Sequence, residues 1–155
     1  MLITIADKND IPALAKLFDQ YRAFYEQKPD INKSVEFLSS RLEKNDSIIF
    51  VARENAEIVG FTQLYPSFSS VGMKQVWILN DLFVSPKFRR KSIARNLMQE
   101  ASNHAKKTGA LRIELATQVS NTLAQNLYES MGYTKNESFY HYSLLVRNDQ
   151  ITQVD

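Results

Sequence analysis

The stretch Val84-Ser85-Pro86-Lys87-Phe88-Arg89-Arg90-Lys91-Ser92-Ile93-Ala94-Arg95-Asn96-Leu97 leads from an apolar strand through a basic turn into a helix. The first N–H groups of a helix have no partner within it, and the helix dipole adds partial positive charge at the same end. An anion such as a phosphate therefore binds readily there. Five basic side chains strengthen this positive field, namely Lys87, Arg89, Arg90, Lys91 and Arg95. The sequence predicts a phosphate-binding turn within residues 84–97.

A cluster of basic residues has two other interpretations, a solvated patch and a nucleic-acid footprint. The formal net charge is only +2, and five of the nineteen basic residues lie between positions 87 and 95. The positive charge is thus local, and its place between a strand and a helix favours phosphate. We therefore expect no nucleic-acid partner. DNA or RNA binding by residues 87–95 is the alternative that the sequence favours least.

The composition is that of an ordinary globular domain. The chain has 155 residues, of which 44% are apolar and 23% charged, and a chain of this length can bury a core of its own. We expect one domain over residues 1–146 and a polar tail over 147–155 that is frayed or pairs with a partner subunit. The absence of cysteine excludes disulfides, thiolate metal sites and a cysteine nucleophile. With no signal peptide and no apolar run near ~18 residues, the sequence predicts a cytoplasmic protein with no membrane partner.

Hydrophobic periodicity predicts strands that alternate with amphipathic helices. The expected strands are residues 2–6, 47–53, 57–65, 76–84, 111–117 and 139–146, with Pro66 ending the third. The expected helices run from Asp10-Pro12 to before Pro29, from 34 to 44, from the basic turn to Thr108-Gly109, and from 121 to 131. This order predicts an α/β fold with a mixed sheet of six or seven strands.

The order of elements, and above all residues 79–97, resembles the GNAT superfamily of acyl-CoA-dependent N-acetyltransferases. The family signature is arginine or glutamine, two variable residues, glycine, one variable residue, then glycine or alanine, and Arg89, Ser92 and Ala94 stand at these places. Ser92 departs from the signature, since glycine adopts positive φ without penalty and lets backbone approach a pyrophosphate. Serine keeps the amide and adds a hydroxyl donor, so we expect the cofactor still to bind, with the loop slightly shifted.

A second segment, residues 121–133, supports the resemblance. It has the family's asparagine at Asn121, the tyrosine seven residues later at Tyr128, and the closing pair Gly132-Tyr133. Within the superfamily, residues 79–84 look most like diamine and polyamine acetyltransferases and their yeast relatives that acetylate histones or amines. Residues 21–26 have the same character.

The resemblance implies a GNAT fold, a mostly antiparallel sheet with about four helices, splayed between strands four and five. Acetyl-CoA would lie in this opening, a neutral amine would attack its thioester directly, and CoA would leave as product. The cofactor-binding residues carried over by position are Leu82, Phe83, Val84, Arg89, Arg90, Lys91, Ser92, Ile93, Ala94, Arg95, Asn121 and Tyr128. The backbone of Leu82 and Val84 would contact the pantetheine arm and the thioester oxygen, and the amides of 90–95 the pyrophosphate. Such donors stabilise charge that develops on the thioester oxygen.

In the family, the tyrosine at the position of Tyr128 donates a proton to the departing CoA thiolate. The alternative for Tyr128 is a partly buried aromatic residue whose hydroxyl binds the backbone. Asn121 fits a helix N-cap, which is compatible with a CoA contact. We expect Tyr128 to be the general acid.

Asp81 is an acid in an otherwise apolar strand and needs a partner, because an isolated buried carboxylate is unfavourable. It could pair with an arginine or accept backbone donors in a purely structural role. The other interpretation is that Asp81, together with Glu26 and Tyr25, binds the substrate ammonium, or that Asp81 takes its proton directly or through water. An amine with a pKa of about 10 must lose a proton before it attacks.

The sequence thus predicts an acetyl-CoA-dependent N-acetyltransferase that acts on a small amine, either a polyamine, a diamine or an amino-acid-like molecule. A protein lysine or N-terminus is an alternative acceptor, and a non-catalytic CoA-binding sensor or interaction module is an alternative class. His104 and His141 have no second ligand in sequence, so we expect no metal. Family members are often dimers, which leaves a homodimer open.

Overall fold

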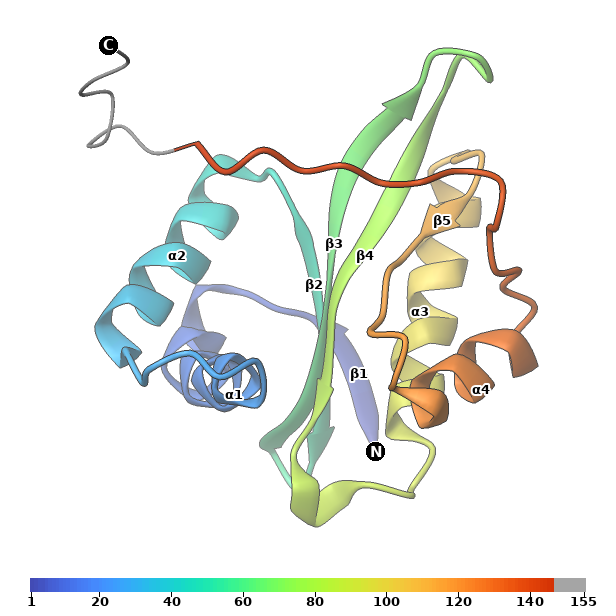
Figure 1. Ribbon diagram of the computed structural model, residues 1–155. Coiled ribbons are helices and arrows are strands. Elements are labelled where there is room, and N and C mark those ends of the chain that lie inside the picture. Colours follow the sequence, from blue (N-terminus) through green and yellow to red (C-terminus); the bar gives the residue numbers. More distant parts are fainter. Residues whose placement is uncertain (147–155) are drawn as a thin grey trace, which may run out of the picture. The chain divides into compact units, whose positions relative to one another are not determined.

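The computed structural model describes residues 1–146. The chain forms two compact units, Met1–Ala116 and Thr117–Asp155. The first unit holds β1 (Leu2–Ile5), η1 (Lys8–Asp10), α1 (Ile11–Phe24), α2 (Ile31–Lys44), β2 (Ile48–Glu54), β3 (Glu57–Ser69), β4 (Lys74–Val84), η2 (Pro86–Phe88), α3 (Ile93–Lys107) and β5 (Ile113–Glu114) (Figure 1). The second unit holds α4 (Thr122–Ser130). The predicted tail, residues 147–155, lies outside the described residues.

The sheet of the first unit has the order β1-β2-β3-β4-β5. The first four strands pair antiparallel and β5 pairs parallel to β4. Helices α1 and α2 lie on one face of the sheet and α3 on the other (Figure 1). The predicted mixed, mostly antiparallel sheet and the four α-helices are confirmed, with five strands in the described residues where six or seven were expected.

The core on one face of the sheet is the apolar side of α1 packed on β2 and β3. Leu14, Leu17 and Phe18 of α1 are buried, and the rings of Phe18 and Phe61 lie 6.0 Å apart. Burying each such side chain contributes about 2 kcal/mol. These contacts hold α1 against the centre of the sheet, where its C-terminal turn overlies β4 through the contact of Tyr21 with Phe83.

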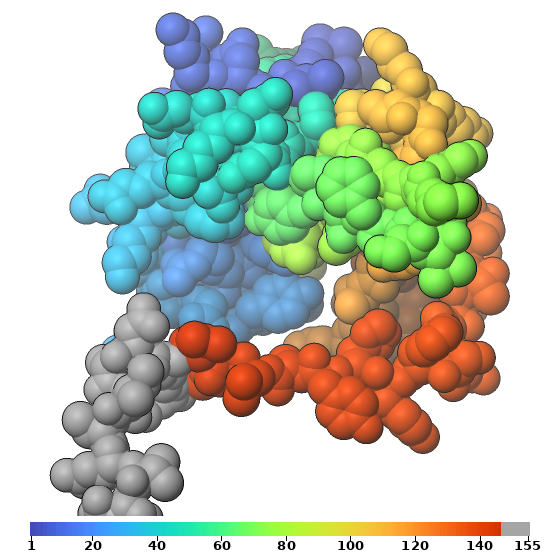
Figure 2. Space-filling view, turned by 90° about the horizontal axis from the view of Figure 1, so that it is seen from above, coloured from blue at the N-terminus to red at the C-terminus, as the bar shows by residue number. Residues whose placement is uncertain are grey.

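The prediction that Pro66 ends its strand was wrong, since β3 continues to Ser69. Pro66 pairs with Trp77 of β4, but β2 ends at the register of Leu64. Beyond Leu64 the strand has one neighbour only, and a proline without an N–H donor is tolerated where a second neighbour is missing. The two strands therefore continue as a hairpin that extends beyond β2, and its tip lies on the near surface in Figure 2 (green).

The expected strand at 139–146 was also wrong, because these residues form no strand in the structure. Their apolar side chains are exposed, as in Tyr142, which is 92% exposed. The described part of their own unit contains a helix and no strand, so a backbone ladder has no partner there. The expected strand 111–117 is shorter than predicted, with only Ile113–Glu114 assigned to β5.

Candidate functional site

The sheet opens between β4 and β5. The two strands pair only at Trp77 with Ile113 and at Ile78 with Glu114, so in the described residues β4 has no β5 partner from Leu79 onward. The backbone N–H and C=O groups of successive strand residues point to opposite edges of the strand. Because the N–H of Ser85 donates to the carbonyl of Val59 at 2.8 Å, the backbone groups of Leu82 and Val84 face the open edge. This is the predicted separation of strands four and five.

The turn after β4 places two residues in the left-handed region, Arg90 with φ 63° and Ser92 with φ 60°. Ser92 stands immediately before α3, and its side chain makes no capping hydrogen bond. Ser92 thus adopts the conformation that favours glycine, at a cost of about 1 kcal/mol. The amides of Ile93 and Ala94 have no carbonyl in a preceding turn of helix. The serine hydroxyl does not compete for these amides, and the anion site at the first turn of α3 stays a prediction.

The basic side chains of the turn do not all face outward. Arg89 turns back, its Nε donating to the carbonyl oxygen of Val84 at 3.1 Å and its guanidinium lying 5.5 Å from the centre of the Phe83 ring. Arg90 and Lys91 are exposed. Arg89 therefore holds the turn against the end of β4, and its cofactor contact stays a prediction.

Gly60 lets α3 approach the sheet closely, a feature that the sequence reasoning missed. A Cβ atom on Gly60 would lie 3.2 Å from the carbonyl oxygen of Phe83 and 3.2 Å from Cγ2 of Ile93. The start of α3 thus packs directly on β3, beside the end of β4. A lone glycine inside the apolar run 58–61 was the available signal.

Asp81 is buried, with 5% of its surface exposed. Its Oδ2 accepts a hydrogen bond from Nε2 of Gln63 at 2.8 Å, and its Oδ1 accepts one from Nδ2 of Asn80 at 3.1 Å. The Tyr21 hydroxyl also binds this carboxylate. All three donors are neutral, and no ion pair involves Asp81 within residues 1–146. The alternative in which an arginine pairs with Asp81 is therefore not found in this part of the chain.

Two tyrosines adjoin Asp81. Burial raises the pKa of Tyr21, and the charge of Asp81 and its hydrogen bond raise it further. Burial and the charge of Asp81 also raise the pKa of Tyr65 to about 12. Both hydroxyls are therefore protonated at neutral pH and act as donors or neutral surface. Sequence reasoning missed Tyr21 because its spacing also suits the core face of α1.

The loop after α1 carries the predicted substrate residues Tyr25 and Glu26. Tyr25 is 41% exposed and meets the Tyr21 ring edge-on, with centroids 5.2 Å apart. Glu26 is exposed and has φ 61°. The structure thus places Tyr25 beside the tyrosine that binds Asp81, with Glu26 next along the loop.

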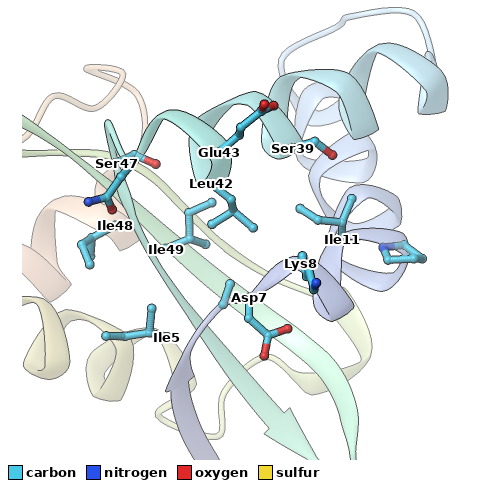
Figure 3. Close-up of a pocket in the computed structure, with 13 residues that line it drawn as sticks. Ile5, Asp7, Lys8, Ile11, Ser39, Leu42, Glu43, Ser47, Ile48 and Ile49 are labelled. Carbon is cyan, nitrogen blue, oxygen red and sulfur yellow. The ribbon is translucent and has the colours of Figure 1, made fainter.

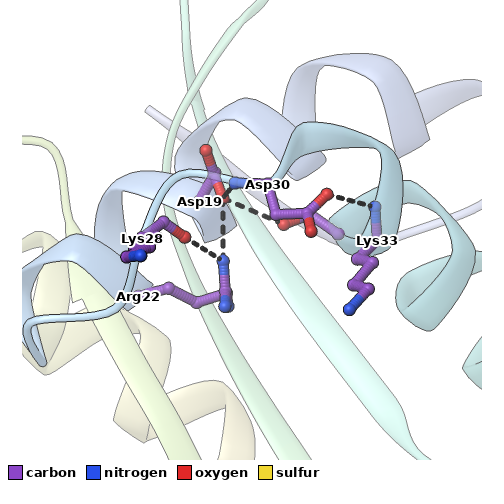
Figure 4. Close-up of polar contacts among 6 residues, drawn as sticks. Asp19, Arg22, Lys28, Asp30 and Lys33 are labelled. Carbon is purple, nitrogen blue, oxygen red and sulfur yellow. Dashed lines mark hydrogen bonds and ion pairs between the residues drawn. The ribbon is translucent and has the colours of Figure 1, made fainter.

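A polar network braces this loop (Figure 4). Oδ1 of Asp19 accepts hydrogen bonds from the Asp30 amide at 2.9 Å, from Nη1 of Arg22 at 3.1 Å and from Oγ of Ser34 at 3.2 Å. Arg22 also donates to the Lys28 carbonyl at 3.0 Å. The ends of α1 and α2 are thereby tied on either side of Tyr25 and Glu26.

The second unit carries Asn121 and Tyr128. Oδ1 of Asn121 accepts a hydrogen bond from the Ala124 amide at 3.2 Å, so the predicted N-cap is confirmed. Tyr128 is half-buried, and its ring centroid lies 6.1 Å from that of Tyr133. Gly132 ends the helix with φ 91°. The cofactor contact of Asn121 and the acid role of Tyr128 stay predictions.

A cavity of about 730 Å³ lies elsewhere in the first unit (Figure 3). Ile5, Ile11, Leu42 and Ile49 line it together with polar groups that include Ser47. None of the predicted site residues lines it. In residues 1–146 no His, Asp and Glu side chains cluster as they would around a metal ion, and no helix has the length and apolar character of a membrane span.

Comparisons with known proteins agree with this architecture. The Acetyltransferase (GNAT) family matches residues 12–133. The chain is 47% identical over 146 residues to an uncharacterized N-acetyltransferase of Bacillus subtilis, YhfO, covering 94% of this chain and 98% of that protein. It is 32% identical over 135 residues to a probable acetyltransferase of Haemophilus influenzae, covering 84% and 88% of the two chains.

A solved structure shows the same fold. The crystal structure of a probable acetyltransferase matches with a TM-score of 0.90 and 40% identity, covering 96% of this chain and 100% of that one. The predicted GNAT fold is confirmed. The chain belongs to the GNAT family and is an N-acetyltransferase.

Proposed function

We propose that this enzyme acetylates the primary amine of a small molecule that binds as an ammonium ion, of the polyamine, diamine or amino-acid-like class. The observation that carries the proposal is the buried Asp81 carboxylate with neutral donors only. An ionised carboxylate has about four acceptor positions, of which three are taken here. A substrate ammonium would bind the remaining position and supply the missing positive charge.

Two relatives support this acceptor class. A thialysine N-epsilon-acetyltransferase of Caenorhabditis elegans is 27% identical over 84% of this chain. An L-ornithine N5-acetyltransferase of Arabidopsis thaliana is 32% identical over 48% of it. These names favour an amino-acid-like amine, and they agree with the likeness of residues 79–84 to diamine and polyamine acetyltransferases.

The residues around the turn fit acetyl-CoA. We propose that the amides of residues 90–95 hold the pyrophosphate and that the open edge at Leu82 and Val84 holds the pantetheine arm, with Phe83 between them. Ser92 supports this role because its hydroxyl does not cap α3. Acetyl-CoA, when bound, supplies the thioester that the amine attacks. An acetyltransferase of the same fold from Clostridium acetobutylicum was solved with acetyl-CoA, at a TM-score of 0.74 and 16% identity.

Each of the chain's own site residues would then have a separate role in the reaction. Asp81 orients the ammonium and takes its proton, directly or through water. Tyr25 and Glu26 flank the amine from the loop after α1. The Tyr128 hydroxyl holds the proton destined for the leaving thiol. The domain would span residues 1–146, since the family match over 12–133 includes parts of both units. A cytoplasmic location and a homodimer stay predictions.

A thiol-release assay with acetyl-CoA and a panel of amines tests the proposal. We expect turnover with polyamines, diamines, or free lysine and ornithine analogues. Turnover only with peptides would show a protein acetyltransferase, and CoA binding without thiol release would show a sensor. Either result would overturn the small-molecule proposal.

Two variants test the assigned roles. Asp81→Asn keeps the shape but not the charge, so kcat/KM for the amine should fall by about 100-fold or more. Tyr128→Phe should lower kcat by about tenfold or more while leaving KM for the amine in place. Val76→Ala, which alters a buried position of the same strand outside the proposed site, controls for general damage to β4.

A further inference from the structure

A chain of buried hydrogen bonds leads to Asp81 from the start of β2. Oγ of Ser47 binds Oε1 of Gln63 at 3.0 Å, and Nε2 of Gln63 binds Oδ2 of Asp81 at 2.8 Å. Gln63 is completely buried, and Ser47 is 7% exposed. The links therefore lie away from competing water, where a hydrogen bond to a charged group is strongest.

The chemistry of the three groups sets the direction of this chain. An ionised carboxylate only accepts hydrogen bonds, so Gln63 must turn its NH2 group toward Asp81. Its carbonyl oxygen then faces Ser47, whose hydroxyl must donate. Ser47 thus fixes which way the Gln63 amide points, and Gln63 fixes one oxygen of Asp81.

A β-bulge places the other oxygen. Gln63 pairs directly with Asp81, whereas the next residue, Leu64, pairs with Leu79. Asn80 is therefore the extra residue on β4, and its side-chain amide reaches Oδ1 of Asp81. Residues directly opposite on antiparallel strands share one face, which aligns Gln63 with the carboxylate.

We propose that Gln63, oriented by Ser47, is a positioning residue that holds the Asp81 carboxylate by a buried hydrogen bond and aims it at the substrate amine. This inference rests on the proposed function. The ionisable groups around Asp81 are Tyr21 from α1 and Tyr65 from β3, together with the Arg41–Asp46 ion pair that acts on Tyr65. The amide donors to the carboxylate, Gln63 and Asn80, do not titrate, so Gln63→Met alters the carboxylate's surroundings without adding or removing a charge.

The test compares the pH dependence of kcat/KM in variants of this chain. Gln63→Met keeps the length of the side chain and removes the donor, so we expect kcat/KM to fall about tenfold or more. The acid limb of the profile should move to higher pH, because the ionised carboxylate has lost a donor. Ser47→Ala should shift the limb in the same direction by less. Gln63→Glu, which places a second carboxyl group beside the first, should shift it most.

Thr62→Val is the matched control. Thr62 is fully buried on the same strand, but its hydroxyl donates to the main-chain oxygen of Asp81 at 2.8 Å and not to the carboxylate. This variant should lose stability and keep the wild-type acid limb. A limb that moves equally in Thr62→Val and Gln63→Met would reduce Gln63 to a packing role and overturn the inference.

A second readout separates the inference from the proposed function. The Asp81 carboxyl carbon can be titrated by NMR in the substrate-free protein, with Asp81→Asn to assign its signal. The signal should titrate at higher pH in Gln63→Met and Ser47→Ala than in the wild type. An unchanged titration refutes the positioning role even if Asp81→Asn is inactive. A shifted titration with a fully active Asp81→Asn instead refutes the catalytic role of Asp81.

Discussion

Asp19 of α1 accepts a hydrogen bond from the main-chain amide of Asp30 at 2.9 Å. Asp30 is the N-cap of α2, so this bond ties the loop between α1 and α2 to α1 at the point where the loop ends. This backbone hydrogen bond is the main reason that the pKa of Asp19 is lowered, and Arg22 and Ser34 contribute in the same direction against the effect of burial. The ionised carboxylate thus holds the loop that carries Tyr25 and Glu26.

Replacing this carboxylate should loosen the loop. In Asp19→Ala three donors lose their acceptor, and we expect a loss of about 2 kcal/mol in the free energy of unfolding and a raised KM for the amine. Because the folded-state pKa is lowered, the stabilisation is complete above the ordinary aspartate pKa of 3.8 and is lost as pH falls through the lower folded-state value. Urea unfolding at several pH values and steady-state kinetics measure both effects.

Lys28→Ala is the control for that experiment, since only the main-chain carbonyl of Lys28 joins the network. It should leave both the unfolding free energy and the KM near the wild-type values. Equal effects of the two substitutions would contradict the role assigned to Asp19.

The left-handed backbone at Ser92 predicts that glycine is the better residue there. Ser92→Gly should stabilise the protein by about 0.5–1 kcal/mol, because relief of the backbone strain exceeds the added entropy of the unfolded chain. Ser92→Ala keeps the strain and removes a hydroxyl that caps nothing, so it should change little. Thermal unfolding checks the stability, and calorimetric titration with CoA shows whether affinity follows it.

A side chain at Gly60 should move α3. The Cβ of Gly60→Ala would lie 3.2 Å from the backbone oxygen of Phe83, and this main-chain atom cannot move aside easily because it is part of β4. We expect a loss of about 1–3 kcal/mol in stability and weaker CoA binding, since the start of α3 is displaced from the end of β4. A Kd for CoA that stays at the wild-type value in Gly60→Ala would argue against a cofactor site at this helix.

His104 predicts a pH dependence of stability. Its ring contacts those of Trp77 and Phe50, with centroids 5.0 and 5.8 Å away. Burial lowers its pKa from 6.5, and the charge of Lys107 lowers it further. The unfolded chain therefore binds a proton first as pH falls below 6.5, and stability declines until pH reaches the folded-state pKa. His104→Phe should lose less stability than the wild type between pH 7.5 and 5.5 in paired urea titrations.

The local elements could be predicted because each depends on neighbours in sequence. The spacing of Leu14, Leu17 and Phe18 predicted α1, and the basic turn with the apolar positions after it predicted the start of α3. Asp81 was recognisable as an acid within an apolar strand. Its partners were not, because the pairing of Gln63 with Asp81 depends on a strand register that includes a bulge at Asn80.

Other differences arose from tertiary context. The contact of the Arg89 side chain with the Val84 carbonyl oxygen could not be predicted, because it depends on how the turn folds back. Pro66 looked like the end of a strand because the sequence does not show how far β2 extends beside it. The alternating pattern of 139–146 suits a strand, but a strand forms only where another backbone lies next to it.

The open edge of β4 from Leu79 to Val84 has a consequence for handling the protein without ligand. In residues 1–146 no strand pairs with this edge, and an unpaired strand edge is a template on which another chain can add. A cofactor lying along this edge would act as a protective cover. The enzyme should therefore aggregate more slowly during storage or heating when CoA is present in excess, even under conditions in which no acetyl group is transferred.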